Sequence, residues 1–223
     1  MGFLDDLKRQ AEEAKARQNT DTSVLERNTA LADAATRIAS DYVVALTQQL
    51  NVLRPRAHAV YRLDKRHAFA AMQLEGFRAD ARRKRLRGAE VFDHVALRWS
   101  MKSGQRLQLV KNFLPDIEQL ESRLKRSGAR FHADAVRNPE TNKLQEMRYE
   151  FVADFEAGLT VTPDHDAGRL RFELVNLDGF ETMTVEFPAF AVGTGRMDEF
   201  ARWVMGQPHA FLKDGQQLRR VEA

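Results

Sequence analysis

Glycine and proline are almost absent from the first 54 residues, and this absence constrains the fold more than any other feature. The segment has one glycine, Gly2, and the first proline of the chain is Pro55. Ala, Leu, Gln, Glu, Arg and Lys predominate there, and these residues lose little rotamer freedom in a helix. The sequence therefore predicts an N-terminal helical segment over residues 1–54 and a different structure over residues 55–223.

A polar interruption divides the helical segment. Residues 19–23 read Asn-Thr-Asp-Thr-Ser, whose side chains compete for backbone hydrogen bonds, and Ser23 and Glu26 have the spacing of a capping box. We predict a short helix over residues 3–18, a break, and a long helix over residues 24–53.

The long helix carries a seam at alternating spacings of four and three, which is typical of a heptad pattern. Its members are Leu31, Ala35, Ile38, Tyr42, Ala45, Gln49 and Val52. Packing on the rest of the chain is favoured over a coiled coil with another molecule, because the pattern lasts only three heptads and includes Gln49. Both alternatives stay open, and the six residues other than Gln49 form a candidate helix interface.

From Gly88 onward the apolar period changes to two, which indicates strands. Residues 91–101 alternate, and the Lys102-Ser103-Gly104 sequence predicts a hairpin in which Trp99 faces Leu107. Residues 130–136 and 146–156 are also expected to be strands. Residues 77–82 suggest an edge strand, whereas residues 67–74 fit a helix or a strand.

One further hairpin has a predicted register. Asp178-Gly179 is a strong signal for a two-residue type I′ turn. Such a turn pairs the apolar residues of the two strands on one face and places Arg171 opposite Glu186 on the other. The apolar pairs are Leu170 with Phe187, Phe172 with Val185, Leu174 with Met183 and Leu177 with Phe180.

Two short helices complete the predicted fold. Pro115 at the start, Gly128 just past the end and apolar residues on one face mark the first, and the second covers residues 197–204. The fold class is therefore α+β: a long N-terminal helical segment, then a mainly antiparallel, hairpin-rich sheet with two helices.

Positive charge is concentrated between the helix and the sheet. Residues 54–87 contain 11 basic and 3 acidic side chains, a net charge of +8, whereas the whole chain has +3. A candidate anion site is formed by Arg78, Arg82, Arg83, Lys84, Arg85 and Arg87. Neutralisation by the acidic C-terminal part is the favoured alternative, since no aromatic residue interrupts the run to stack on bases.

Several chemistries have no candidate residues. The chain has no cysteine, its six histidines lack ligand spacing, and Asp164-His165-Asp166 before Gly168 fits a turn better than a metal site. We assign no catalytic, metal-ligating or cofactor-binding residue. Without a signal peptide or membrane span, a cytoplasmic protein is expected. The first dozen residues are similar to the start of many uncharacterised bacterial proteins, and this similarity implies no function.

Three functions remain. The first hypothesis is a non-enzymatic interaction or assembly module that self-associates or binds a protein partner through its N-terminal helices. The second is binding of nucleic acid or another polyanion through residues 78–87. The third is a small-ligand binder or enzyme with a pocket on the sheet face.

Overall fold

A computed structural model describes the backbone of residues 3–222, and all side chains in that range except those of residues 3–7, 11 and 13–20. The predicted α+β class is confirmed. The helices are α1 (Phe3–Leu53), α2 (Leu114–Arg126) and α3 (Thr194–Val204), with a short 3-10 turn η1 (Ala189–Ala191). The strands are β1 (Tyr61–Arg62), β2 (Ala68–Phe69), β3 (Gln73–Leu86), β4 (Ala89–Lys111), β5 (Phe131–Arg137), β6 (Leu144–Asp164), β7 (Arg169–Val175), β8 (Glu181–Pro188) and β9 (Gln216–Glu222).

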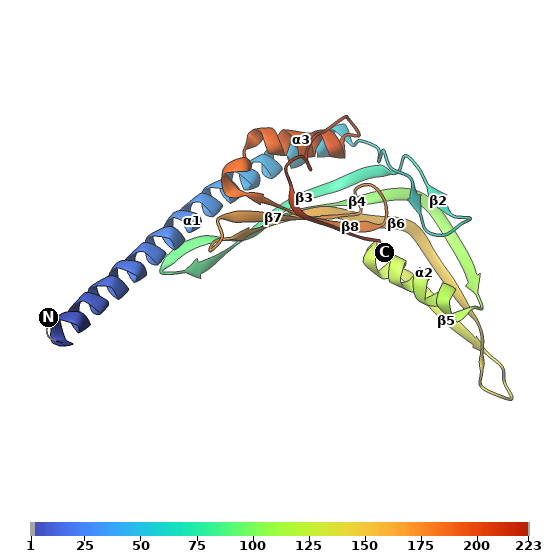
Figure 1. Ribbon diagram of the computed structural model, residues 1–223. Helices are drawn as coiled ribbons and strands as arrows, with labels where there is room; N and C mark the ends of the chain where they lie inside the picture. The colour runs from blue at the N-terminus through green and yellow to red at the C-terminus, as the bar shows by residue number, and fades with distance from the viewer. Residues whose placement is uncertain (1–2, 223) are drawn as a thin grey trace.

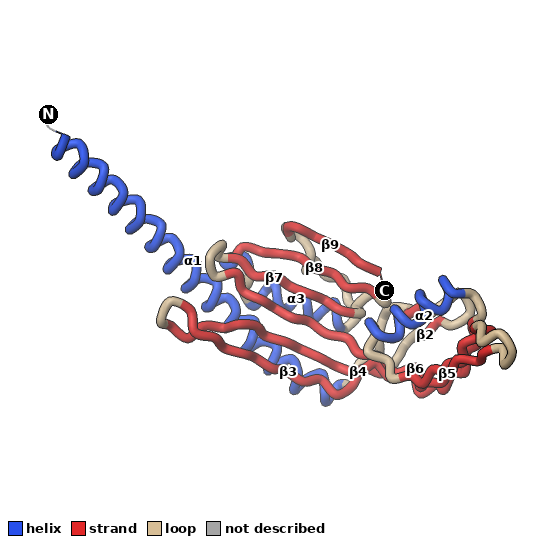
Figure 2. Tube along the Cα trace, turned by 90° about the horizontal axis from the view of Figure 1, so that it is seen from below, coloured by secondary structure: helices blue, strands red, loops and turns tan. Residues whose placement is uncertain are grey.

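The main sheet is antiparallel and curved. Its order is β3-β4-β6-β7-β8-β9, with β5 added beside β6, while β1 and β2 pair only with each other. The helices α1 and α3 lie across one face, and the N-terminal arm of α1 extends past the sheet (Figure 1). Figure 2 shows the strands from below, with α1 and α3 behind them.

The predicted break at residues 19–23 is wrong, because α1 is one continuous helix of 51 residues. Asp21, Thr22 and Ser23 are exposed. Exposed polar residues in a helix interior each cost only about 0.5–0.7 kcal/mol relative to Ala, and neither Gly nor Pro occurs there to add a larger cost. The flanking helix formers therefore continue through the interruption.

Small residues bring α1 close to the sheet, and two polar side-chain bonds fasten it there. Ala32, Ala35 and Ala39 are buried in the same apolar cluster as the sheet residues. Asn51 donates to Phe77 O at 2.8 Å and accepts from Phe77 N at 2.9 Å. Both bonds form beside a bulge in β3, where the strand ladder leaves these backbone groups unpaired.

The predicted hairpin at residues 102–104 is also wrong. β4 continues for 23 residues, and residues 103–105 form an irregularity opposite the single β6 residue Ala153. Gly104 adopts a φ of +69°, which suits a bulge as well as a turn. The hairpin turn is instead at Arg87 and Gly88, which join β3 to the start of β4. Trp99 consequently pairs with Ala157 of β6.

The register of the β7–β8 hairpin is confirmed for Leu170–Phe187, Phe172–Val185, Leu174–Met183 and Arg171–Glu186. The type I′ turn is wrong: the strands separate after Val175, and Asp178 lacks the positive φ that this turn requires. The loop is instead fixed by a residue outside the hairpin. The hydroxyl of Tyr61, in β1, lies 2.9 and 2.8 Å from the carbonyl oxygens of Asn176 and Leu177.

The remaining predicted elements are present with different lengths. The structure confirms the two short helices as α2 and α3 and the strand at residues 130–136 as β5, and it extends the strand at residues 146–156 into β6. Residues 77–82 belong to the edge strand β3 as expected. The division into residues 1–54 and 55–223 stays a prediction.

Candidate helix interface and cationic cleft

The residues of the predicted helix interface are divided between two faces of α1. Ala35 is buried against the sheet, and the Tyr42 hydroxyl donates to Asp198 Oδ1 of α3 at 2.6 Å. The others are exposed: Leu31, Ile38, Ala45 and Val52. Together with exposed Val24 they recur every seven residues and define the outer stripe of α1, the name used below for these five residues. The exposed fraction is 39% at Val24 and at Ile38, and 81% at Val52.

The basic run lies on the edge strand β3 and its turn, and its side chains have different partners. Lys84 pairs with Asp93 at 3.1 Å, Arg83 lies 4.4 Å above the Phe92 ring, and Arg87 pairs with Asp166. In the described part of the chain, no partner is recorded for three of its members: Arg78, Arg82 and Arg85. Successive strand positions point to opposite faces, so the run does not form one continuous track.

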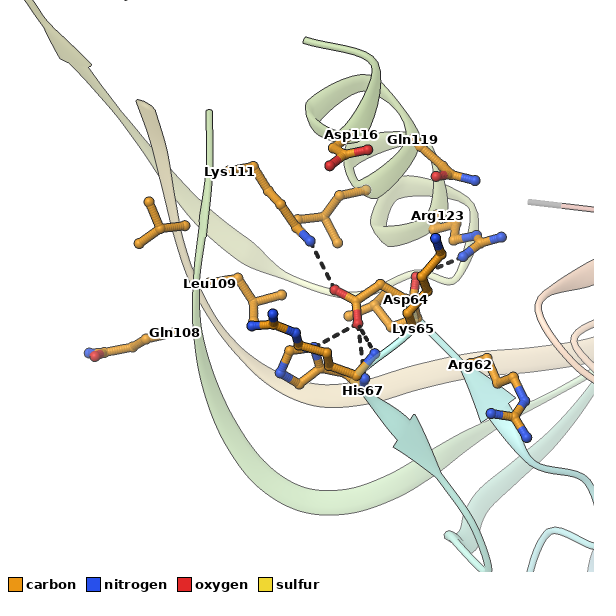
Figure 3. Close-up of a pocket in the computed structure, with 14 residues that line it drawn as sticks. Arg62, Asp64, Lys65, His67, Gln108, Leu109, Lys111, Asp116, Gln119 and Arg123 are labelled. Atoms are coloured by element: carbon orange, nitrogen blue, oxygen red, sulfur yellow. Dashed lines mark hydrogen bonds and ion pairs between the residues drawn. The ribbon is translucent and has the colours of Figure 1, made fainter. Parts of the chain in front are cut away.

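A cleft of about 1020 Å³ opens where the β1–β2 loop, the end of β4 and α2 meet. Its lining has more positive than negative side chains. The cations are Arg62, Lys65, Arg66, Lys111 and Arg123, and the carboxylates are Asp64 and Asp116. This gives a formal charge of +3 with His67 neutral. Figure 3 shows Asp64 between Lys111 and His67, with Arg123 reaching from α2 toward the same loop.

Asp64 holds the β1–β2 loop in one conformation. Its Oδ1 accepts from the backbone nitrogens of Arg66 and His67, both at 2.9 Å, and lies 2.8 Å from His67 Nδ1. Its Oδ2 accepts from Lys111 Nζ at 3.0 Å. Burial acts to raise the pKa of the Asp64 carboxyl, but these donors outweigh it, so the pKa lies well below its usual value. Asp64 is therefore ionised at neutral pH, with both oxygens engaged.

The other two elements fix the loop from either side. Lys111, at the end of β4, reaches Asp64, and Arg123 of α2 donates to Leu63 O at 2.7 Å. The loop residues between them, Lys65 and Arg66, are exposed, and no side-chain partner is recorded for either within residues 3–222. The cleft thus combines a loop that is fixed from both sides with cations that have no side-chain partner in the described residues: Lys65 and Arg66 on the loop, and Arg62 on β1.

A second polar cluster lies near the β7–β8 loop. Asp178 Oδ1 accepts from Trp203 Nε1 at 2.7 Å and contacts His58 Nε2 at 3.0 Å. Burial acts to raise the pKa of Asp178, and the hydrogen bonds from His58 and Trp203 outweigh it and lower the pKa. The indole of Trp203 also stacks on the His209 ring, with ring centroids 4.5 Å apart. Because its members belong to separate segments, this cluster fastens α3 and the loop before β1 to the sheet.

The sequence Asp164-His165-Asp166 forms the predicted turn between β6 and β7. Asp164 Oδ1 accepts the backbone N–H groups of Asp166 and Ala167, and His165 Nε2 lies 2.8 Å from Phe92 O. Asn28 of α1 donates to Asp166 O at 2.7 Å, so the turn is anchored to the helix.

Sequence reasoning missed the cleft, although one signal for it was present. Arg62, Lys65 and Arg66 belong to the segment of net charge +8, but the run at residues 78–87 is more conspicuous in the sequence. The other two cations of the cleft, Lys111 and Arg123, lie much later in the sequence, and only the fold brings them near this segment. The charge density of residues 54–87 was thus a signal for the cleft, and the basic run at residues 78–87 lies outside it.

Compared with models of known protein families, with curated proteins and with solved structures, the chain has no match. No α-helix in the described residues has the length and apolarity needed to cross a bilayer. Those residues also contain no group of three or more His, Asp or Glu side chains that could hold a metal ion.

Proposed function

We propose that this protein is an assembly module whose helix α1 binds a second copy of the chain. The observation that carries the proposal is the outer stripe of α1, in which an apolar residue recurs every seven positions on a side of the helix that stays exposed. A surface helix of a monomer typically has one apolar face, directed at its own core. Here α1 has such a face, at Ala32, Ala35 and Ala39, and the outer stripe in addition.

The spacing favours a helix as the partner. A seven-residue period keeps one apolar side chain per heptad facing a second helix that winds around the first with a left-handed twist. The alternate seam positions Ala35 and Tyr42 contact the sheet and α3 of the same chain. Exposed apolar residues are common individually, whereas five at a fixed spacing along one side of a helix form a regular row, which supports an interaction site. A second copy provides an identical row, which a two-fold axis pairs with the first.

Charged substitutions in the stripe test the proposal. Leu31→Lys combined with Ile38→Lys should weaken self-association by about 3 kcal/mol, or roughly 100-fold in Kd, because two apolar side chains lose their burial. The measurement is molar mass by light scattering after size exclusion, over a range of protein concentrations. Both substitutions are at exposed helical positions that accept Lys.

Val44→Lys is the matched control. Val44 is 48% exposed on the same helix, close to the 44% of Leu31, but it is six residues from Ile38 and therefore about 120° around the helix axis. This variant should associate as the unchanged protein does. A monomer at every concentration, or equal dissociation by Val44→Lys, would refute the proposal.

The polyanion hypothesis has less support. Arg83, Lys84 and Arg87 have partners within the chain, and the remaining members of the run are shared between the two faces of β3. Binding through this run stays a prediction, with loss of nucleic-acid binding in an Arg82→Ala, Arg85→Ala double variant as its test.

A further inference from the structure

The cationic cleft is separate from the outer stripe of α1, since none of the described α1 side chains lines it. Its volume of about 1020 Å³ is at the upper end of the range typical of small-molecule sites. The three elements around it are tied together by the Lys111–Asp64 and Arg123–Leu63 contacts. The cleft is therefore formed before any ligand arrives, and binding needs little reordering of the loop.

The charges in the cleft favour an anion. Asp64, the carboxylate nearest to the loop cations, already accepts Lys111 and two backbone N–H groups. Lys65 and Arg66 follow it directly and have no recorded side-chain partner in the described chain. An incoming anion would supply the acceptors that these two cations lack, and a guanidinium binds phosphate through two parallel hydrogen bonds.

The rest of the lining narrows the class of anion. Among the side chains that the structure describes, no Phe, Tyr or Trp lines the cleft to stack on a nucleobase. The face of α2 toward the cleft carries Asp116 and Gln119, one helical turn apart, whose oxygens can accept hydrogen bonds from hydroxyl groups. The lining thus combines unpaired cations on the β1–β2 loop with two hydrogen-bond acceptors on α2, beside Arg123 of the same helix, and this combination matches a molecule with both phosphate and hydroxyl groups.

We infer that this cleft binds a small phosphorylated polyol, such as a sugar phosphate. Lys65 and Arg66 hold the phosphate, and Asp116 and Gln119 accept hydrogen bonds from the hydroxyl groups. This gives the small-ligand hypothesis a specific location, at the junction of the β1–β2 loop, β4 and α2.

Isothermal titration calorimetry of the full chain at low ionic strength tests the inference, with glucose 1,6-bisphosphate and inorganic pyrophosphate as probes. The Lys65→Gln, Arg66→Gln variant should bind both probes about tenfold or more weakly, because the phosphate loses its charged donors. The Arg130→Gln, Lys143→Gln variant removes the same charge from exposed positions outside the cleft and should bind both probes as the unchanged protein does.

A second variant separates the two halves of the site. Gln119→Leu removes a hydrogen-bonding side chain from α2 without changing the charge of the cleft, so it should weaken binding of glucose 1,6-bisphosphate but not of pyrophosphate. The inference is overturned if neither probe binds, if only pyrophosphate binds, if the control variant loses as much affinity as the loop variant, or if Gln119→Leu affects both probes equally.

Discussion

At the scale of single residues, Asp64 couples the conformation of a loop to pH. Its folded-state pKa lies below the value of about 3.9 for a free Asp, so its contribution to stability is present above pH 4 and is lost as the pH falls further. Asp64→Asn should lower the free energy of unfolding by about 2 kcal/mol at pH 7, since a charged acceptor with several donors is removed.

Urea denaturation between pH 2 and pH 7 measures this effect. The difference between Asp64→Asn and the unchanged protein should shrink steadily below about pH 4, where the unchanged protein loses the same contribution. Exposed Asp80 provides the control, because Asp80→Asn should leave the pH profile as it is. A constant difference across the whole pH range would contradict the role given to Asp64.

Gly158 is a second single position on which the sheet depends. A Cβ there would lie 2.6 Å from Leu97 O and 2.7 Å from Arg98 Cδ, because the Arg98 side chain crosses the glycine to reach Leu159 O at 2.8 Å. Gly158→Ala should therefore destabilise the protein by about 1–3 kcal/mol through overpacking.

Gly195 gives the opposite expectation within the same chain. It lies inside α3, and a Cβ added there would have no atom within 4 Å, so Gly195→Ala should stabilise the helix by up to about 1 kcal/mol. Thermal unfolding of the two variants compares the signs directly, and an unchanged melting temperature for Gly158→Ala would show that Arg98 can move aside without loss.

At the scale of elements, the attachment of α1 depends on strand irregularities as well as on apolar contact. Asn51→Ala leaves both backbone groups of Phe77 without their partner and should cost about 2 kcal/mol. Amide hydrogen exchange should also become faster at Phe77. Gln48→Ala, at an exposed position nearly one turn earlier on α1, is the control and should change neither quantity.

The same elements explain which parts of the fold the sequence predicted. α2 was predictable because Pro115 and Gly128 mark both ends, and the β7–β8 register was predictable because apolar and charge pairing agree. β4 was not, because Gly104 allows either a turn or a bulge, and the choice depends on the pairing of β4 with β6, a strand that comes only after α2 and β5. The cleft was unpredictable for a related reason, since only the fold brings the β1–β2 loop beside the end of β4 and the following helix α2.

At the scale of the whole molecule, the two proposed surfaces should respond oppositely to salt. Ions screen the attraction between a phosphate and the exposed Lys65 and Arg66, so raising NaCl from low to physiological ionic strength should weaken binding of glucose 1,6-bisphosphate several-fold. Association through the apolar outer stripe of α1 should stay equal or become stronger. Calorimetry and light scattering on one preparation, at matched salt concentrations, measure both responses, and parallel weakening would count against an apolar interface.

Because β3 is an edge strand, its arginines also affect whether the sheet can pair with another strand. A long edge strand has unpaired backbone N–H and C=O groups that can pair with any extended chain, including β3 of a second copy of the protein. The four successive cations at residues 82–85 lie on both faces of β3, and they repel the same four cations of a second β3 strand. If copies associate through α1 as proposed, this repulsion would keep them from also pairing strand to strand, which at an edge without such charges could continue into fibres.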